Sequence, residues 1–215
     1  MKFLLYALCA VIGYFLGNIS AGLLIARRMG NIDIRDYGSG NAGTTNVLRT
    51  LGWLPSVLTL IGDALKGALA ALIGKWIGGE VGMLVGGLFA VIGHNWPALF
   101  HFRGGKGMAT TLGVVIVAHH AWALALFLPW LVIVALTRYV SVASITMCVV
   151  YPIITAVVYH AKPLGWLHIV VFCLIGLMGI YGHRGNIQRL LKHEENRLDF
   201  KKISEISKKK RQDKK

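Results

Sequence analysis

The number of membrane crossings in this chain depends on how one stretch is interpreted: TLGVVIVAHHAWALALFLPWLVIVAL, residues 111–136. A helix of roughly 20 apolar residues crosses a bilayer, so this stretch is long for one span. His119 and His120 lie near its middle, and polar side chains are costly at the centre of a hydrocarbon layer. If the two histidines mark an outer turn, residues 105–118 and 121–136 are two spans. The alternative is one long span that buries the histidine pair.

The rest of the chain has five further apolar segments, and its composition excludes most soluble enzymes. Of its 215 residues, 55% are hydrophobic and 15% are charged, whereas soluble domains carry roughly a quarter charged residues. Its three cysteines all lie in apolar segments, which excludes a disulfide framework and a CxxC metal site. The sequence therefore predicts an all-α integral membrane protein, with further spans at residues 3–25, 53–74, 81–100, 142–159 and 164–181.

The placement of charge predicts an odd number of spans. Cytoplasmic loops collect Lys and Arg, and the loop after the first segment contains Arg27, Arg28, Arg35 and Arg49, so the N-terminus should lie outside. Residues 183–215 hold 12 basic and 5 acidic residues, and this surplus of +7 is half of the net charge of +14. This segment should therefore lie inside. Splitting residues 111–136 at the histidines makes the number of spans odd, so that the N-terminus lies outside and the C-terminus lies inside. We therefore predict about seven transmembrane helices with a cytoplasmic C-terminus.

The same pattern divides the chain into two parts. Residues 1–195 form a polytopic membrane domain. Residues 196–215 form a basic tail, which we expect to be flexible and dispensable for catalysis because it has little apolar surface to bury.

A first glycine-rich segment, DIRDYGSGNAGTTNVLR, occupies residues 33–49. Its glycines allow positive φ angles and close backbone approach. A helix should begin near residues 44–46, with an Asn or Thr cap. Backbone N–H groups at such a helix start favour an anion such as phosphate, and Arg49 can add a bidentate contact. The alternative is a polar loop that only connects helices.

A second segment, GHNWPALFHFRGGKGMATT, occupies residues 93–111. Pro97 ends or kinks the preceding helix and leaves His94 at its cytoplasmic end. Arg103 and Lys106 combine positive charge with glycines that can fold around an anion. A merely positive cytoplasmic loop would explain the cations, but not a Gly-Gly-Lys-Gly turn that leads directly into an apolar helix.

A third segment, HRGNIQRLLKHEE, occupies residues 183–195 and leaves the last span. His183 and Asn186 fall on neighbouring positions of a helix. A basic helix lying on anionic lipid would explain the arginines but does not require this histidine or asparagine. Within a predicted span, Asp63 and Lys66 have i, i+3 spacing, so they either neutralise one another or belong to the site.

Three predicted cytoplasmic loops thus offer many anion ligands and few acids. The sequence has no HExxH, no GxSxG and no Cys/His metal pattern, so we expect no metal and no cofactor. The loops therefore predict a site for phosphate groups. One alternative is a transporter of a phosphorylated solute, which would need polar features on both faces, whereas the outer loops are short. Another is a structural membrane protein with a lipid-binding basic tail, which would not require the glycine-rich loops.

In these segments the chain resembles the bacterial acyl-phosphate:glycerol-3-phosphate acyltransferase family (PlsY type). The similarity rests on GSGNxGxTN at residues 38–46, on GHNWP and GGKGxAT within residues 93–110, and on HRxNIxRLLxxxE at residues 183–195. The intramembrane D-x-x-K-G at residues 63–67 also fits. This sequence departs from the family at Ala42, commonly Pro, at Thr44, commonly Ala, and at His193, often Gly.

The resemblance implies an acyltransferase of the bacterial cell inner membrane. It would move an acyl chain from acyl phosphate to the 1-hydroxyl of sn-glycerol 3-phosphate and so give lysophosphatidic acid, the first step of phospholipid synthesis. The implied partners are these two substrates, membrane lipid and a functional link to an enzyme that makes acyl phosphate, with no nucleic acid. The general base is either His183 or the phosphate of the donor.

The resemblance also implies roles for residues at the matching positions. Those expected to act in catalysis are Ser39, Asn41, Arg49, His94, Lys106, His183 and Asn186. Those expected to bind substrate are Gly40, Thr45, Asn46, Gly104, Gly105, Gly107, Ser141 and Glu195. Ser144 is an alternative to Ser141, and Glu194 is an alternative to Glu195.

Overall fold

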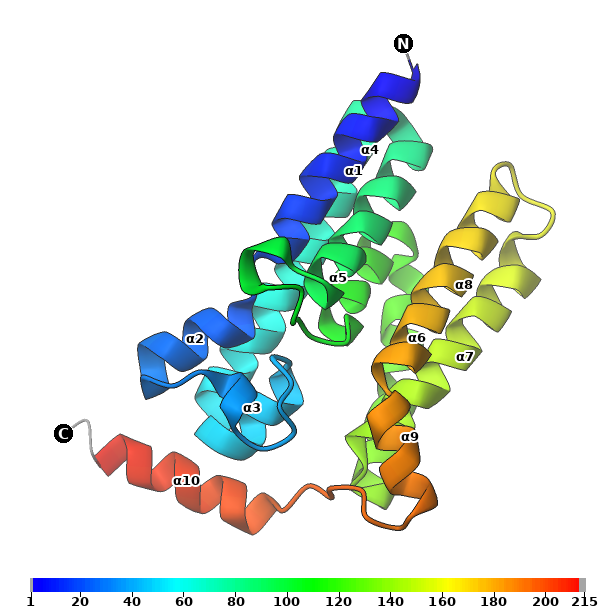
Figure 1. Cartoon of the computed structure of the whole chain (residues 1–215). Coiled ribbons are helices and arrows are strands. Elements are labelled where there is room, and N and C mark those ends of the chain that lie inside the picture. The colour runs from blue at the N-terminus through cyan, green and yellow to red at the C-terminus, as the bar shows by residue number, and fades with distance from the viewer. Residues whose placement is uncertain (1, 213–215) are drawn as a thin grey trace.

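The computed structural model describes residues 2–212, and all regular elements within that range are helical. This confirms the predicted fold class (Figure 1). The elements are α1 (Lys2–Asn18), α2 (Ala21–Gly30), the 3₁₀ helix η1 (Ile34–Asp36), α3 (Thr44–Leu51), α4 (Trp53–Asn95), the 3₁₀ helix η2 (Ala98–Phe100), α5 (Met108–Ala118), α6 (His120–Thr137), α7 (Val140–Tyr159), α8 (Gly165–Gly182), α9 (Arg184–Leu191) and α10 (Phe200–Gln212).

Helix α4 is a hairpin of two helical arms, which correspond to the predicted second and third spans. Gly78 and Gly79 have non-helical backbone angles, and Gly79 has φ 64° and ψ −147°, a conformation open mainly to glycine. The backbones of Gly74 and Gly82 touch across the hairpin, which shows that the arms run antiparallel. Helix α1 packs along this hairpin (Figure 1).

The long apolar stretch is divided at His119, as the sequence predicted. Helix α5 ends at Ala118 and α6 begins at His120. The turn is nevertheless not a simple polar loop, because His119 is buried and hydrogen bonds with Tyr151 of α7 and His168 of α8, while His120 is exposed. His168 in turn contacts Glu80 beside the α4 turn. The α4 turn, the α5–α6 turn and the start of α8 therefore lie at one end of the bundle.

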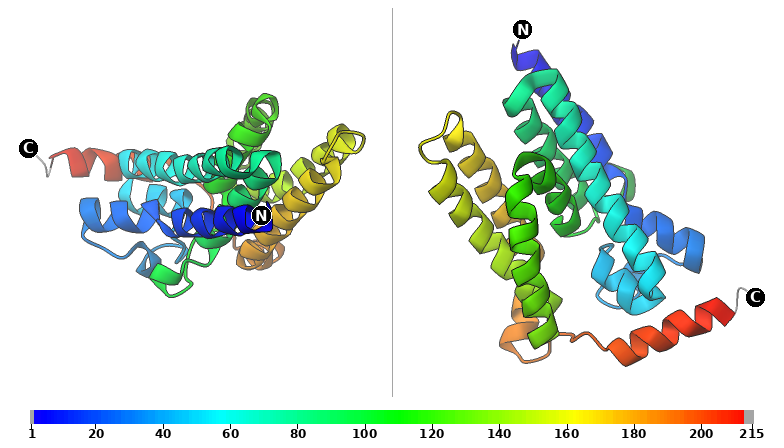
Figure 2. Two further views of the ribbon diagram at one scale, coloured as in Figure 1. Left: turned by 90° about the horizontal axis from the view of Figure 1, so that it is seen from above. Right: turned by 180° about the vertical axis from the view of Figure 1, so that it is seen from behind.

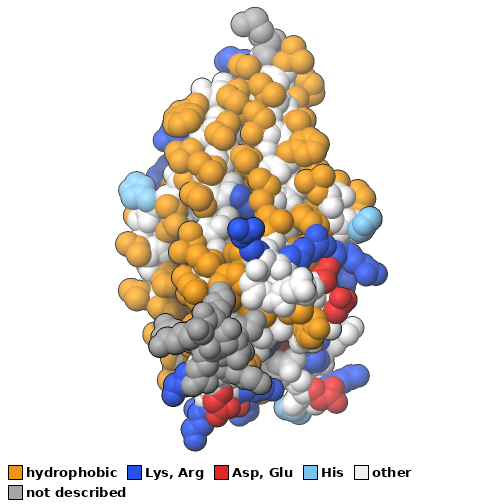
Figure 3. Space-filling model, turned by 90° about the vertical axis from the view of Figure 1, so that its left-hand side faces the viewer, with side chains coloured by type: hydrophobic (Ala, Val, Ile, Leu, Met, Phe, Trp, Pro, Cys, Tyr) orange, Lys and Arg blue, Asp and Glu red, His pale blue; other side chains and the backbone are white. Residues whose placement is uncertain are grey.

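Five helices in the described range are long and apolar enough to cross a membrane. One of them is the α4 hairpin, and α5, with 11 residues, is shorter than this length. Hydrophobic side chains cover much of the face seen in Figure 3, and charged side chains gather mainly at its lower end. Each of the seven predicted segments is mainly helical, while seven crossings and the orientation of the termini stay predictions.

The first predicted span is wrong at its C-terminal end, because the chain breaks there into α1 and α2. The Asn18 side chain donates to the Tyr14 carbonyl oxygen (2.7 Å) and accepts from the backbone N–H of Leu99 (3.2 Å). Asn18 thereby ties the end of α1 to η2. Helix α2 then leads away at an angle toward the end of the molecule opposite the N-terminus (Figures 1 and 2).

The tail that the sequence analysis expected to be flexible contains helix α10 and packs on the membrane domain. Leu198 and Ile203 are buried in a cluster with Leu48 of α3. The ring of Phe200 stacks on Trp53 at the start of α4, with 6.4 Å between centroids. The scarcity of apolar residues in the tail did not indicate these contacts. That the tail is dispensable for catalysis stays a prediction.

Replacing Gly79 with Ala should destabilise the protein by about 1–3 kcal/mol, because the turn requires a backbone conformation that alanine rarely adopts. A Cβ at Gly79 would meet no atom within 4 Å, so the cost would come from the backbone alone. The measurement is the apparent Tm in detergent. Gly185→Ala is the matched control, because this helical position has space and should be neutral or stabilising. Equal Tm values for the two variants would contradict the expectation.

Candidate active site

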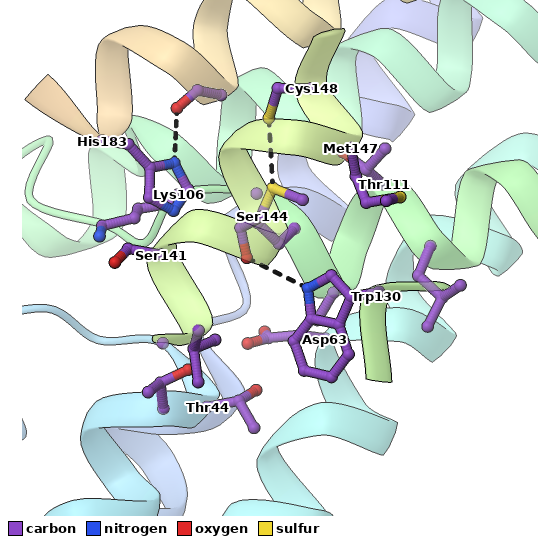
Figure 4. A pocket seen from close by; sticks show the side chains of 18 of the residues that line it. Thr44, Asp63, Lys106, Thr111, Trp130, Ser141, Ser144, Met147, Cys148 and His183 are labelled. Carbon is purple, nitrogen blue, oxygen red and sulfur yellow. Dashed lines mark hydrogen bonds between the residues drawn. The ribbon is translucent and has the colours of Figure 1, made fainter. Parts of the chain in front are cut away.

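The three glycine-rich segments meet around one cavity of about 390 Å³. Arg49, Lys106 and His183, one from each segment, line the same end of it. Figure 4 shows Lys106, Ser141 and His183 close together, with Trp130, Met147 and Cys148 farther along the cavity. The predicted convergence of the three segments is therefore present in the structure.

The Glu195 carboxylate organises the polar end of this cavity. It is buried (6% exposed) and its Oε1 accepts from Ser141 Oγ (3.0 Å) and Asn186 Nδ2 (2.7 Å). Its Oε2 accepts from Arg189 Nε at 2.9 Å. The Asn186 side chain makes a second hydrogen bond, in which its Oδ1 accepts from Lys106 Nζ. Glu195 thus orients Asn186 so that its carbonyl faces the lysine.

Both open alternatives from the sequence are distinguished by this geometry. Glu194 is exposed, whereas Glu195 lies in the cluster. Ser141 contacts Glu195, whereas Ser144 Oγ, which also lines the cavity, accepts from Trp130 Nε1 at 3.3 Å. Ser141 and Glu195 are therefore the members of each pair that join the polar network.

A left-handed turn at His193 brings Glu195 back toward α9. His193 has φ 59°, and the next backbone N–H, that of Glu194, donates to the Arg189 carbonyl oxygen at 2.8 Å. Such a turn normally favours glycine at the left-handed position. This explains why a glycine is frequent in the resembling family where this chain has His193.

His183 is buried at the junction of α8 and α9 and is neutral at pH 7. Its Nδ1 donates to the Gly179 carbonyl oxygen at 2.8 Å, so Nε2 carries the free lone pair. Burial, reinforced by the positive charge of Lys106, lowers the pKa of His183 to about 4. The ring can therefore accept a proton or a hydrogen bond from a hydroxyl group in the cavity.

Two cations at the polar end make it a site for phosphate. Burial lowers the pKa of Lys106 to about 8, partly opposed by the negative charge of Glu195. Burial also lowers the pKa of Arg49, whose guanidinium donates to the Asn196 carbonyl oxygen at 2.8 Å. Partly desolvated cations bind anions strongly.

Among residues 2–212, no group of three His, Cys, Asp or Glu side chains is arranged to hold a metal ion.

In the first segment, Asn46 shapes the loop from within. Its Nδ2 lies within 2.9 Å of the carbonyl oxygens of Ile34, Tyr37 and Asn41, and its Oδ1 accepts from the backbone N–H of Ser39 (2.9 Å). The carboxamide is buried and engaged by the loop backbone. Asn46 also lines the cavity, as do four other members of the predicted set: Ser39, Asn41, Thr45 and Arg49.

Helix α3 begins at Thr44, as predicted, but the expected Asn or Thr cap is wrong. The N-cap position is Gly43, with no side-chain capping bond, and Asn41 Oδ1 instead accepts from the backbone N–H of Gly43 at 2.9 Å. The first N–H groups of a helix lack helical partners. Thr44 and Thr45, the first two residues of α3, line the cavity.

The second segment wraps around His94. The backbone N–H of Gly105 donates to the His94 carbonyl oxygen at 3.1 Å, and a Cβ at Gly105 would lie 2.0 Å from His94 Nε2. On its other side, His94 Nδ1 lies 2.8 Å from Lys66 Nζ, which pairs with Asp63 at 2.8 Å. The pairing of Asp63 with Lys66 is therefore present, and Asp63 also lines the cavity. Gly104 and Gly105 line a larger polar basin that adjoins Lys106.

Sequence reasoning missed the apolar end of the cavity. It is lined by Val115, Trp130, Met147, Tyr151 and Phe172, which lie on four different helices. Each looks like an ordinary membrane-span residue in the sequence. One pattern in the sequence could have indicated this lining. Four residues of α7 recur at the i, i+3, i+4 spacing of one helix face: Ser141, Ser144, Cys148 and Tyr151.

A cationic cluster at the mouth of an apolar cavity, within a helical membrane bundle, defines a class of proteins: membrane enzymes that join a phosphorylated group to a lipid chain. Comparisons with known proteins agree. The family model described as glycerol-3-phosphate acyltransferase matches residues 7–193. A protein named glycerol-3-phosphate acyltransferase from Clostridioides difficile (strain 630) is 41% identical, covering 94% of this chain and all of its own length. One of the same name from Thermoanaerobacter sp. (strain X514) is 41% identical over 90% of this chain and 96% of its own.

Solved structures agree as well. The crystal structure of PlsY (YgiH), an integral membrane glycerol 3-phosphate acyltransferase, in its glycerol 3-phosphate form has a TM-score of 0.83 and 39% identity, covering 92% of this chain and 98% of that one. A lysophosphatidic acid form of PlsY has a TM-score of 0.80 and the same identity. This chain belongs to the glycerol-3-phosphate acyltransferase family. The resemblance found in the sequence is confirmed, the protein is a multi-pass membrane acyltransferase that acylates glycerol 3-phosphate for phospholipid synthesis, and the transporter alternative is set aside.

Glu195→Gln should lower kcat/KM for glycerol 3-phosphate by about 10- to 100-fold. The new amide would present a donor to Ser141, Asn186 or Arg189, and an unsatisfied buried group costs about 1–3 kcal/mol. Acyl transfer in detergent is the measurement, and Glu194→Gln, one residue away and exposed, is the control. If both variants behaved alike, Glu195 would not organise the site.

Binding of glycerol 3-phosphate should weaken as the pH rises through about 8. The pKa of Lys106 is lowered to about 8, so its charge is present below this pH and lost above it, whereas the ligand phosphate, with a second pKa of about 6, keeps its charge throughout. Calorimetric Kd values between neutral and alkaline pH in detergent measure this directly, without a reactive donor. A Kd that stayed constant to well above pH 8 would contradict the lowered pKa.

Proposed function

We propose that the acyl donor is acyl phosphate and that the acceptor is the 1-hydroxyl of sn-glycerol 3-phosphate, giving lysophosphatidic acid. The membrane is the inner membrane of a bacterial cell, with the three glycine-rich segments on the cytoplasmic face. An enzyme that makes acyl phosphate supplies the donor. The observation that carries this proposal is the single cavity in which a cationic end continues into an apolar end.

Glycerol 3-phosphate occupies the polar end beside Lys106. Arg49 and Lys106 bind its phosphate, and His183 faces its hydroxyl group. Ser141, whose own O–H donates to Glu195, contacts the molecule as an acceptor. Asn186 orients the molecule from a position fixed by Glu195 (2.7 Å). These residues come from α3, the loop before α5, α7 and α9, so the phosphate holds together four separate parts of the bundle.

Acyl phosphate enters with its phosphate against the first segment and its chain in the apolar end. Ser39, Asn41, Thr45 and the start of α3 contact this phosphate from the cavity, Gly40 approaches it from the adjoining polar basin, and Asn46 maintains the loop. The turn at Gly104, Gly105 and Gly107 lies beside it, held in shape by His94. Backbone N–H groups of such turns bind anionic oxygens without adding bulk.

The reaction needs no covalent intermediate with the protein. The donor is a mixed anhydride and is already activated. The acceptor oxygen attacks the acyl carbonyl carbon, phosphate leaves with the electrons of the broken C–O bond, and the hydroxyl proton passes to His183 Nε2 or to the departing phosphate. Holding both molecules in register can supply roughly 7–11 kcal/mol of the barrier. Cys148 lines the cavity, but its thiol faces the Met108 sulfur at 3.6 Å.

The purified protein should convert acyl phosphate and glycerol 3-phosphate to lysophosphatidic acid without added metal. Lys106→Ala should lower this activity by about 100-fold or more, because a hydrogen bond to a charged group is worth up to ~3 kcal/mol and the site also loses its cation. Product formation is followed by mass spectrometry.

Lys162→Ala is the control, because Lys162 lies in the turn between α7 and α8, where its ammonium contacts the Tyr159 ring. It should retain full activity. Turnover with acyl-CoA and none with acyl phosphate would refute the donor assignment. Full activity of Lys106→Ala would refute the phosphate site.

A further inference from the structure

The apolar end of the cavity stops at the same level on four helices. Its last lining residues are Val115 on α5, Ala123 on α6, Tyr151 and Pro152 on α7, and Phe172 on α8. One turn farther on, the residues that continue these faces are His119, Thr155 and His168, and none of them lines the cavity. The cavity therefore ends against a layer of side chains rather than tapering off along one helix.

Two aromatic rings make up most of this layer. Tyr151 and Phe172 pack edge to face, with 4.9 Å between centroids and an interplanar angle of 89°. Phe172 is fully buried and Tyr151 is 6% exposed. Both are large, and both are held by neighbours on the side away from the cavity.

The Tyr151 hydroxyl is fixed by a chain of polar groups that the acyl-transfer chemistry does not use, and this chain runs through two buried histidines to the exposed Glu80. It hydrogen bonds with His119 Nδ1, His119 Nε2 lies 2.8 Å from His168 Nδ1, and His168 Nε2 lies 2.6 Å from Glu80 Oε1. Because the Glu80 carboxylate can accept at the end of the chain, each group can donate to the next, from Tyr151 through the two imidazole rings. Tyr159 stacks on both histidine rings at 4.3 and 4.6 Å and prevents their rotation.

We propose that Tyr151, anchored by His119, His168 and Glu80, forms the end wall of the acyl site and limits the length of the acyl chain. Tyr151 follows Ser141 by ten residues on α7, a rise of about 15 Å. An extended chain of roughly a dozen carbon atoms, with bonds of about 1.5 Å, spans that distance. This inference rests on the proposed function, because it places the acyl chain of the donor in this cavity.

The test is the kcat/KM of purified protein with lauroyl, myristoyl, palmitoyl and stearoyl phosphate. Tyr151→Ala should raise the myristoyl-to-lauroyl ratio by about tenfold, because a site for about a dozen carbon atoms then admits two more methylenes and each buried methylene contributes about fourfold. A residue with only a structural role would lower all four rates together. Tyr151→Phe keeps the ring and should keep the ratio.

Val157→Ala is the matched control, because it shortens an exposed side chain of the same helix, α7, that does not line the cavity. Its ratio should equal that of the unmodified protein. Ala123→Ile fills the same end of the cavity from α6 and should shift the ratio the other way, toward shorter chains, which keeps the test decisive if Tyr151→Ala does not fold.

An unchanged ratio in active Tyr151→Ala and Ala123→Ile would overturn the inference, because the chain would then leave the cavity sideways past the exposed Leu131 of α6. Failure of the unmodified protein to use any acyl phosphate would instead refute the proposed donor. The two failures are therefore distinguishable in one set of measurements.

Discussion

The rest of the site depends on the three hydrogen bonds that the Glu195 carboxylate accepts from Ser141, Asn186 and Arg189. Lys106 is partly buried beside this group, and a buried cation without a compensating charge is costly. Glu195 supplies that charge while its own oxygens are fully hydrogen bonded, which is the condition under which a buried carboxylate is tolerated. The cationic end is thus assembled before any phosphate arrives, and a bound phosphate then adds the remaining negative charge.

The cavity has a polar end and an apolar end, just as the proposed donor has a phosphate group and an acyl chain. Its polar end can attract phosphate groups from water, and its apolar end can bury an acyl chain at roughly 25 cal/mol per Å² of apolar surface. In the proposed reaction the acyl carbonyl lies where the two ends meet, and Ser141 and His183 lie close together there (Figure 4). Because His183 is neutral there, it can assist proton transfer without competing with Lys106 for the phosphate.

Local patterns in the sequence were enough to predict the helical segments, the turn at His119 and the convergence of three loops, because periodicity, glycine-rich turns and charge placement act over a few residues. Asn46 was predicted to be near the site, but its three carbonyl contacts arise from a loop conformation that no local pattern encodes. The break after Asn18 depends on Leu99, and the docking of α10 depends on Trp53. Both contacts join residues far apart in the sequence, so only the tertiary structure shows them.

The Gly-Gly-Lys-Gly turn illustrates how packing and binding share one sequence feature. Phosphate binding alone would require exposed N–H groups, yet Gly105 also rests on the His94 ring so closely that a side chain would collide with it. His94 is held in turn by Lys66, which pairs with Asp63 inside the membrane. The position of Lys106, the residue after Gly105, is therefore set from beneath by a buried ion pair. The charges of Asp63 and Lys66, which are costly within a membrane span, thus hold in place the turn that carries Lys106.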